Sequence, residues 1–316
     1  MKRSFLFIAC LVLALVAGPL LAAKPGPVRS APTATVTIAG NPLSVVIGDD
    51  TAMQVYNSNV LSNPPGSGQY YPGGTVPGET ANAGIWVHPS GGLVYGPASV
   101  GISGGSFTPV SLSPVTGTGT AVDPFTVVVV VNIPTTSVQM TETITYVNGA
   151  SAAIIVLSFV GDGNPVVTLD AFIGADLYLA GNDAGFSFAT AASAGGNAAD
   201  DNCLQLQYTI SFLGTTVADR YSANGYGQIW SEIAAGTLSD TFNPSCIDNG
   251  ASLQWTNRAV GAAPVVINTA ASFTGQLIPA GPTAIVPALS PKGLAALVLL
   301  LAAVGYVLAK KTSLGA

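Results

Sequence analysis

Alternation of apolar and polar residues constrains the fold of this chain more than any other feature. From Val138 to Val147 (VQMTETITYV), apolar side chains fall mostly on one side and threonines on the other. The segment from Leu204 to Leu213 (LQLQYTISFL) repeats the pattern. A period of two is that of a β-strand with one face buried and one face in water. Both segments are therefore predicted to be half-buried strands.

Two neighbouring runs are apolar at nearly every position, Phe125–Ile133 (FTVVVVVNI) and Ala152–Val160 (AAIIVLSFV). Such runs are typical of central strands that are covered on both faces. Asn148-Gly149 precedes the second run and suits the positive-φ positions of a tight hairpin. Residues 125–160 are therefore predicted to form a three-stranded meander.

Turn-forming residues are abundant, with 37 glycines and 22 prolines, and strands do not alternate with helices. The only helical pattern is a short one around Trp230–Leu238. Further strands are expected near 34–40, 43–47, 52–60, 84–88, 92–96, 166–173, 253–257 and 264–274. These features predict an all-β fold, a large antiparallel β-sandwich over residues 33–276. A supersandwich of the sugar-mutarotase kind is the alternative shape.

The first 23 residues have the pattern of a secretory signal peptide. A basic start and an apolar run precede a Gly-Pro break and the small residues Ala22 and Ala23. We expect the Sec translocon to export the chain and signal peptidase to cut after one of these alanines. Residues 24–32 would then form a short linker.

Residues 293–309 form an uncharged apolar segment that Lys310 and Lys311 follow directly. A helix of this length is about 25 Å long, near the lower limit for a membrane span. The basic flank favours a cytoplasmic C-terminus. We therefore expect a Pro-rich linker over 277–292, a transmembrane helix over 293–309 and a basic tail over 310–316.

The linker contains a motif that resembles the IPTL-type C-terminal sorting signal of exported Gram-negative bacterial proteins. The residues that carry the resemblance are Val286, Pro287, Ala288, Leu289, Ser290 and Gly293. Lys292 stands where that family usually has an aromatic residue. The resemblance implies an exosortase-like membrane peptidase as a partner. It also implies transit through the inner membrane to the cell envelope or the exterior, with the C-terminal segment either cut there or kept as an anchor.

The charge balance of the central body excludes nucleic acid as a partner. Between residues 30 and 285 there are two arginines, no lysine and all fifteen acidic residues, so the net charge is 2 − 15 = −13. Phosphate backbones are bound by clusters of basic residues, and this region has none.

After signal removal, two cysteines remain, Cys203 and Cys246. An even number of cysteines in an exported protein indicates a disulfide. Both lie beside turn-like sequence, where distant chain segments can approach each other. A Cys203–Cys246 disulfide is therefore predicted.

Residues that could carry out catalysis are scarce. Gly101–Gly105 (GISGG) matches the Gly-x-Ser-x-Gly nucleophile motif, but no helical pattern follows it. His88 is the only histidine, whereas mutarotase-type enzymes use two histidines and a carboxylate. The prediction from sequence is that the chain is not an enzyme.

Acidic loops could supply oxygen ligands to Ca²⁺, the one cofactor considered. The pairs and triplets concerned are Asp162 with Asn164, Asp200 with Asp201 and Asn202, and Asp248 with Asn249. Turn formation is the favoured interpretation of these residues, since none has the spacing of a known calcium loop. Glu142 falls on the apolar face of its predicted strand, where it needs a cleft or a partner such as Arg220 or Arg258.

Aromatic residues cluster in a Gly- and Pro-rich region and could stack on sugars. The candidate glycan-binding residues are Tyr56, Tyr70, Tyr71, Trp86 and Tyr95, with core packing as the rival interpretation. The sequence as a whole favours an envelope-anchored acidic protein with a structural or adhesive role. The alternatives are a carbohydrate-binding surface protein with polysaccharide as partner and, after it, a carbohydrate-active enzyme.

Overall fold

The computed structural model describes residues 34–57, 83–98, 102, 104–178, 184–199 and 202–274. All of them belong to the first of two compact units, Met1–Gly275 and Gln276–Ala316. The predicted signal peptide, the sorting motif and the apolar segment 293–309 lie outside the described residues. Within those residues, no helix is both long enough and apolar enough to span a membrane.

Fifteen strands of the described part of the chain form one sheet. Its main path runs, in spatial order, through β6 (Gly105–Ser106), β5 (Tyr95–Gly96), β4 (Ala83–Pro89), β11 (Val167–Asp176), β17 (Cys246–Val260), β12 (Ala184–Thr190), β13 (Ser193–Ala199), β14 (Gln205–Gly214), β18 (Val265–Thr274), β10 (Ala152–Val160), β9 (Gln139–Tyr146), β8 (Phe125–Asn132) and β7 (Thr108–Leu112). Two strands lie off this path: β15 (Arg220–Gly225) pairs with β17, and β16 (Thr241–Phe242) pairs with β15.

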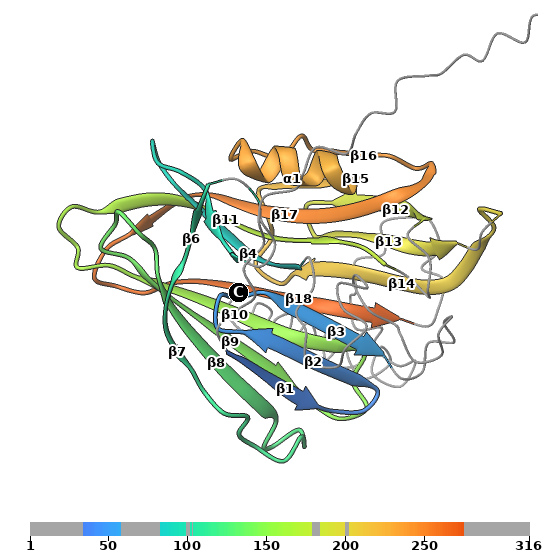
Figure 1. Ribbon diagram of the computed structural model, residues 1–316, viewed down its shortest axis with the longest axis horizontal. Coiled ribbons are helices and arrows are strands. Elements are labelled where there is room, and N and C mark those ends of the chain that lie inside the picture. The colour runs from blue at the N-terminus through green and yellow to red at the C-terminus, as the bar shows by residue number, and fades with distance from the viewer. Residues whose placement is uncertain are drawn as a thin grey trace, which may run out of the picture. The chain divides into compact units, whose positions relative to one another are not determined.

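The two ends of this path, β6 and β7, are separated along the chain by Phe107 alone. The sheet therefore curls until its two edges meet in one continuous chain segment, as Figure 1 shows at the left of the view. A fold rich in β-strands is thus confirmed, but the prediction of a two-sheet sandwich is wrong.

The strand that joins what would have been two sheets is β17. Its first residues, Cys246–Asp248, pair with β12, and the rest of the strand pairs with β15 and β11. Gly250 follows directly after this change of partner and packs against the backbone oxygen of Ala175. A glycine at such a point lets a strand bend closely against a neighbour, so that one sheet continues around the corner.

A smaller antiparallel sheet covers the inner face of the large one. It consists of β1 (Thr35–Ala39), β2 (Leu43–Gly48) and β3 (Met53–Asn57), which lie in front of β8–β10 in Figure 1. Its apolar side chains share one buried cluster with the inner side chains of the large sheet. The hydroxyl of Tyr146 accepts a hydrogen bond from Leu43 N at 3.1 Å and donates one to Ala150 O at 3.0 Å. This side chain ties the two sheets together.

The meander predicted over residues 125–160 is confirmed. β8 pairs with β9 and β9 with β10 in antiparallel register, and Gly149 of the turn between β9 and β10 has φ +87°. The prediction that the outer runs are covered on both faces is wrong. Ile154 is 43% exposed and Val160 is 37% exposed, because no other element of the described chain packs on that side of β10.

One helix, α1 (Tyr226–Ala234), lies four residues earlier than its predicted position. It covers the outer face of β4, β11 and β17, where Ile229 and Ile233 bury a second cluster with Trp86 and Phe172. The helix ends at Ala234, and Gly236 just beyond the C-cap residue Ala235 has a φ of +75° and donates a backbone hydrogen bond to Ile233 O, as a glycine that terminates a helix does. The ring of His88 packs where a side chain at Gly236 would lie.

The predicted disulfide is confirmed. Cys203 and Cys246 are bonded, with their Cα atoms 5.8 Å apart and a sequence separation of 43. The bond connects the residues just before β14 to the first residue of β17.

Candidate functional site

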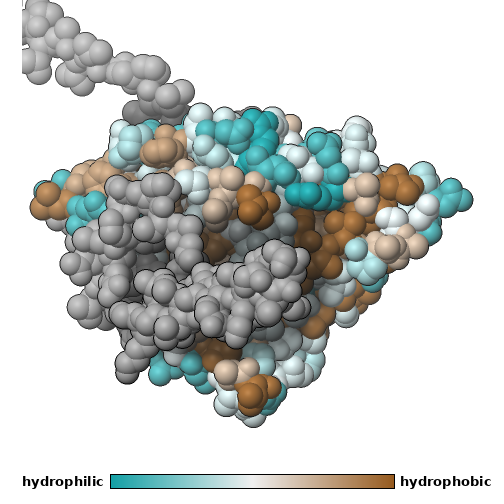
Figure 2. Space-filling view, turned by 180° about the vertical axis from the view of Figure 1, so that it is seen from behind, coloured by the Kyte–Doolittle hydropathy of each residue, from teal (hydrophilic) through white to brown (hydrophobic). Residues whose placement is uncertain are grey.

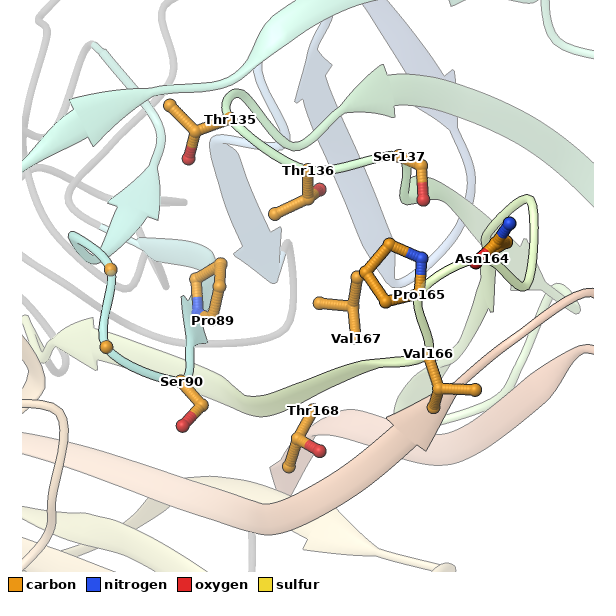
Figure 3. Close-up of a pocket in the computed structure, with 12 residues that line it drawn as sticks. Pro89, Ser90, Thr135, Thr136, Ser137, Asn164, Pro165, Val166, Val167 and Thr168 are labelled. Carbon is orange, nitrogen blue, oxygen red and sulfur yellow. The ribbon is translucent and has the colours of Figure 1, made fainter.

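A pocket of about 620 Å³ opens where three connections of the large sheet meet. The β4–β5 turn contributes residues 89–92, the β8–β9 turn contributes residues 135–137, and the segment around the start of β11 contributes residues 164–168. In Figure 3, Pro89 and Ser90 stand across the opening from Asn164 and Pro165. Antiparallel strands place these turns at one end of the sheet, although they are far apart in sequence.

The wall of the pocket combines hydroxyl groups with small apolar surfaces. Its twelve residues include no charged and no aromatic side chain. The polar side chains are Ser90, Thr135, Thr136, Ser137, Asn164 and Thr168, and the apolar ones are Pro89, Pro165, Val166 and Val167. Such a lining offers both donors and acceptors of hydrogen bonds but no group that could neutralise a charged ligand.

Three of the pocket hydroxyls, those of Thr135, Thr136 and Ser137, make hydrogen bonds within the protein and hold the wall in place. Thr135 Oγ1 and the Tyr95 hydroxyl are hydrogen-bonded at 3.0 Å. Thr136 Oγ1 donates to Ile133 O at 2.8 Å and accepts from Val138 N at 3.1 Å. These bonds order the β8–β9 turn, in which Thr135 has a left-handed φ of +62°.

Asp162 holds the opposite wall. Its Oδ1 accepts hydrogen bonds from the Ser137 hydroxyl at 2.8 Å and from Asn164 N at 3.0 Å. The backbone bond from Asn164 and the bond from Ser137 lower the pKa of Asp162 below its ordinary value of 3.8. The carboxylate thus links the β8–β9 turn to the loop that presents Asn164 and Pro165, and the interpretation of Asp162 with Asn164 as a turn is the one that this geometry supports.

The remaining polar side chains of the pocket, Ser90, Asn164 and Thr168, make no hydrogen bond of their own to the described part of the chain. Ser90 and Thr168 are held side by side, because Ser90 N donates to Thr168 O at 2.9 Å. Their hydroxyls and the Asn164 amide are therefore available to a bound molecule.

The predicted aromatic residues that the structure describes, Tyr56, Trp86 and Tyr95, do not form one exposed surface. Trp86 is 1% exposed and lies under α1, with its ring centroid 5.4 Å from that of Trp230. Tyr95 faces the main core and supports the pocket from behind through its bond to Thr135. Tyr56 is in β3, while Tyr70 and Tyr71 lie outside the described residues.

Glu142 is buried as its place on the apolar face of β9 predicted, with 1% of its surface exposed. Neither of the two described arginines accompanies it, since Arg220 pairs with Asp240 at 2.9 Å and Arg258 with Asp219 at 2.7 Å. Its Oε2 has no hydrogen-bond partner. Burial, and after it the nearby negative charge of Asp50, raise the pKa of Glu142 from 4.5 to about 8, so that it keeps its proton at neutral pH.

The other candidate residues do not assemble into a site. Gly101 and Ser103 of the Gly-x-Ser-x-Gly match are outside the described residues, and the segment after them forms β6 and β7 instead of a helix. Among the described residues, no three His, Cys, Asp or Glu side chains are grouped as a metal ion would require. Asp248 is exposed while Asn249 is buried, and Asp200 and Asp201 are not described.

No protein-family model matches the chain, and no curated protein matches it. Solved structures do match. One, described as a kojibiose phosphorylase from the human microbiome, has a TM-score of 0.42 and 9% identity, and the match covers 75% of this chain and 29% of that one. A bacterial glucoamylase complexed with acarbose has a TM-score of 0.49 and 9% identity, over 80% of this chain and 34% of that one.

A third match, described as an aldose 1-epimerase from Escherichia coli K12, has a TM-score of 0.40 and 9% identity, over 77% of this chain and 99% of that one. The chain thus spans about a third of the first two structures. The prediction that it is not an enzyme is corrected by these matches, since all three are named as enzymes of carbohydrates. At this identity and these TM-scores, the matches themselves assign neither an activity nor a substrate.

Proposed function

We propose that the pocket at residues 89–92, 135–137 and 164–168 binds a neutral saccharide. The observation that supports the proposal is the lining itself, which has free hydroxyl and amide groups beside proline and valine surfaces and no charge. Sugar hydroxyls both donate and accept hydrogen bonds, as Ser90, Asn164 and Thr168 also can. The C–H faces of a pyranose ring can pack on Pro89, Pro165 and Val166.

The absence of charge from the lining argues against other classes of small ligand. Phosphates, carboxylates and amines lose their hydration on binding and need an opposite charge in return. A volume of about 620 Å³ lies within the range of small-molecule sites, about 300–1,000 Å³. Without an aromatic platform, a hexose of about 12 heavy atoms at about 0.3 kcal/mol each would bind with roughly millimolar affinity.

The test is calorimetric titration of the full chain with glucose, galactose, maltose and cellobiose. We expect at least one of these sugars to bind, and the variants Thr168→Val and Ser90→Ala to weaken it about 5- to 10-fold each, about 1 to 1.4 kcal/mol. Thr168→Val keeps the shape of the side chain and removes only the hydroxyl.

Thr143→Val is the matched control, because Thr143 lies on β9 facing away from the core and lines no part of the pocket. It makes the same change of chemistry and is expected to leave sugar affinity unchanged. Full sugar affinity in both Thr168→Val and Ser90→Ala would place the ligand elsewhere and refute the proposal.

A second candidate function is acid–base catalysis on a carbohydrate, and Glu142 is the observation that favours it. A carboxyl group that keeps its proton at neutral pH near a second carboxyl group can act as a general acid in glycosidic cleavage. Substrate would reach this group only after movement of the structure around it, since Glu142 is 1% exposed. Nitrophenyl glycosides test this role: turnover that disappears in Glu142→Gln and persists in Ser90→Ala would support it, and a wild-type chain without turnover would exclude it for these substrates.

A further inference from the structure

Charge is nearly absent from five adjacent strands of the large sheet. β7, β8, β9, β10 and β18 contain one charged residue, Glu142, and its side chain faces inward. On the outer face, β9 presents Thr141, Thr143 and Thr145, all partly exposed. The neighbouring strands present mostly aliphatic residues, namely Val128 and Val130 on β8, Ile154 and Val156 on β10, and Val266 on β18.

The strand register assembles these side chains into a regular array. Thr143 stands between Val128 and Val156, and Thr145 between Thr126 and Ile154. Paired positions on adjacent strands lie about 5 Å apart, so the rows form one continuous surface. We call the outward side chains of β7–β10, with Val266 and Asn268 at the start of β18, the outer face. Ala270 and Ser272, further along β18, are buried and do not belong to it. Ile154 and Val266 on the outer face are 43% and 48% exposed.

No described element covers the outer face. The small sheet β1–β3 lies on the opposite side of β8–β10, and α1 lies over β4, β11 and β17 (Figure 1). The threonines of β9 make no side-chain hydrogen bond to the described part of the chain. Exposed rows of β-branched residues are what two sheets bury when they pack face to face.

The distribution of charge indicates the partner. The described ion pairs, Arg220–Asp240 and Arg258–Asp219, belong to residues 219–258, and Glu232 is on α1, all outside the five strands. In the space-filling view of Figure 2, polar side chains gather along the upper part of the molecule and apolar ones at the right. Two copies of a body with a net charge of −13 repel each other wherever their acidic surfaces meet. The outer face itself carries no charged side chain, and the nearest acidic residues, Asp123 before β8 and Asp162 after β10, are exposed at its ends. Two copies can therefore approach over the middle of this face without bringing like charges together.

We propose that the outer face binds the outer face of a second copy of this chain, as a two-fold symmetric pair. Four strands about 4.8 Å apart and about seven residues long, with the start of β18, give an area of about 500 Å² per copy, or about 1,000 Å² in total. Specific interfaces begin at about 1,000 Å², so this contact is at the weak end of the range and its dissociation constant is micromolar or higher. Salt strengthens the association, because it screens the repulsion between the two acidic bodies.

Sedimentation velocity of the full chain tests this proposal, in a polyoxyethylene detergent that keeps the apolar segment 293–309 from associating. We expect a dimer that forms with rising protein concentration and whose affinity increases when sodium chloride is raised. Thr143→Lys places a charge at the centre of the outer face and is expected to weaken the dimer at least about 10-fold. Gln228→Lys adds the same charge on the exposed side of α1 and is expected to leave the dimer unchanged.

Ile154→Thr is the second variant, in case the charged one does not fold. It keeps a β-branched side chain and removes apolar surface, so it should weaken the dimer by about 3-fold or more. A wild-type chain that stays monomeric up to about millimolar concentration, where weak contacts are populated, overturns the proposal, as do equal affinities of Thr143→Lys and Gln228→Lys. Loss of pelleting with insoluble cellulose in Thr143→Lys, without any change in sedimentation, would show that the outer face takes a glycan surface instead, and would overturn it too.

Discussion

Replacement of Glu142 by glutamine should remove most of the pH dependence of stability between about pH 5 and pH 8. The side chain is 1% exposed, and its pKa is about 8 in the folded protein, against 4.5 without burial. The unfolded chain therefore loses this proton first as pH rises. The contribution of Glu142 to the free energy of unfolding is fully present below about pH 4.5. It decreases as the pH rises from there and is lost above about pH 8.

The magnitude follows from the two pKa values. At about 1.4 kcal/mol for each pKa unit, the difference between 4.5 and about 8 corresponds to about 5 kcal/mol in total. Of this, about 3 to 4 kcal/mol falls between about pH 5 and pH 8. Glutamine has nearly the same shape and does not titrate, so the variant should lack this slope.

Urea unfolding followed by tryptophan fluorescence measures the effect, since Trp86 and Trp255 are buried in the two apolar clusters. Asp50→Asn is the matched variant. It should reduce the slope without abolishing it, because burial contributes more to the raised pKa of Glu142 than the charge of Asp50 does. A wild-type slope equal to that of Glu142→Gln across this range would refute the reasoning, since it would mean that Glu142 ionises in the folded protein as it does in water.

Three further predictions concern the disulfide, the helix cap and the pocket wall. Replacing Cys203 and Cys246 together by serine should lower the free energy of unfolding by about 4 kcal/mol for a loop of this length; unfolding midpoints in urea check this, and an unchanged midpoint would contradict it. Gly236→Ala should destabilise the fold by about 1 to 3 kcal/mol through its left-handed φ and the ring of His88, whereas Gly227→Ala, at an open position of α1, should stabilise it by up to about 1 kcal/mol. Equal thermal melting points of these two variants would disprove that account. Ser137→Ala removes a bond to Asp162 and should weaken sugar binding several-fold in calorimetry while leaving the melting point within a few degrees; full affinity in this variant would show that the link to Asp162 does not shape the pocket.

Local patterns were sufficient for the parts of the fold that depend on neighbouring residues. The threonines of β9 alternate with buried side chains because one face of that strand meets the core. Gly149 has the positive φ expected of the turn, whereas Asn148 does not. The same alternation placed Glu142 inside. The disulfide followed from the number of cysteines in a predicted exported chain.

The closure of the sheet depends on contacts that no local pattern records. β17 pairs with β11, β15 and β12, which come from separate parts of the sequence, and this pairing joins the halves into one sheet. The apolar runs of β8 and β10 predict strands that are covered on both faces, but the structure leaves their outer side chains accessible. The start of α1 gave no signal, because Gly225 at its N-cap makes no side-chain hydrogen bond.

The pocket was missed for the same reason. Its residues are common turn formers, and Pro89, Ser137 and Asn164 become neighbours only when three connections meet at one end of the sheet. Each of these turns adjoins a predicted strand, but β4 and β11 lie near one end of the strand order and β8 and β9 near the other, so only the closure of the sheet brings the turns together. Two of the aromatic residues that suggested sugar binding are instead buried, Tyr95 in the main core and Trp86 in the cluster under α1.

Methyl-resolved NMR of the full chain during titration with maltose and cellobiose tests the saccharide pocket most directly. Val166 and Val167 line the pocket, whereas Val45 and Val55 of the small sheet do not. The account predicts chemical-shift changes that saturate at Val166 and Val167 and leave Val45 and Val55 unmoved. Saturable changes at other valines, with Val166 and Val167 unaffected, would contradict it.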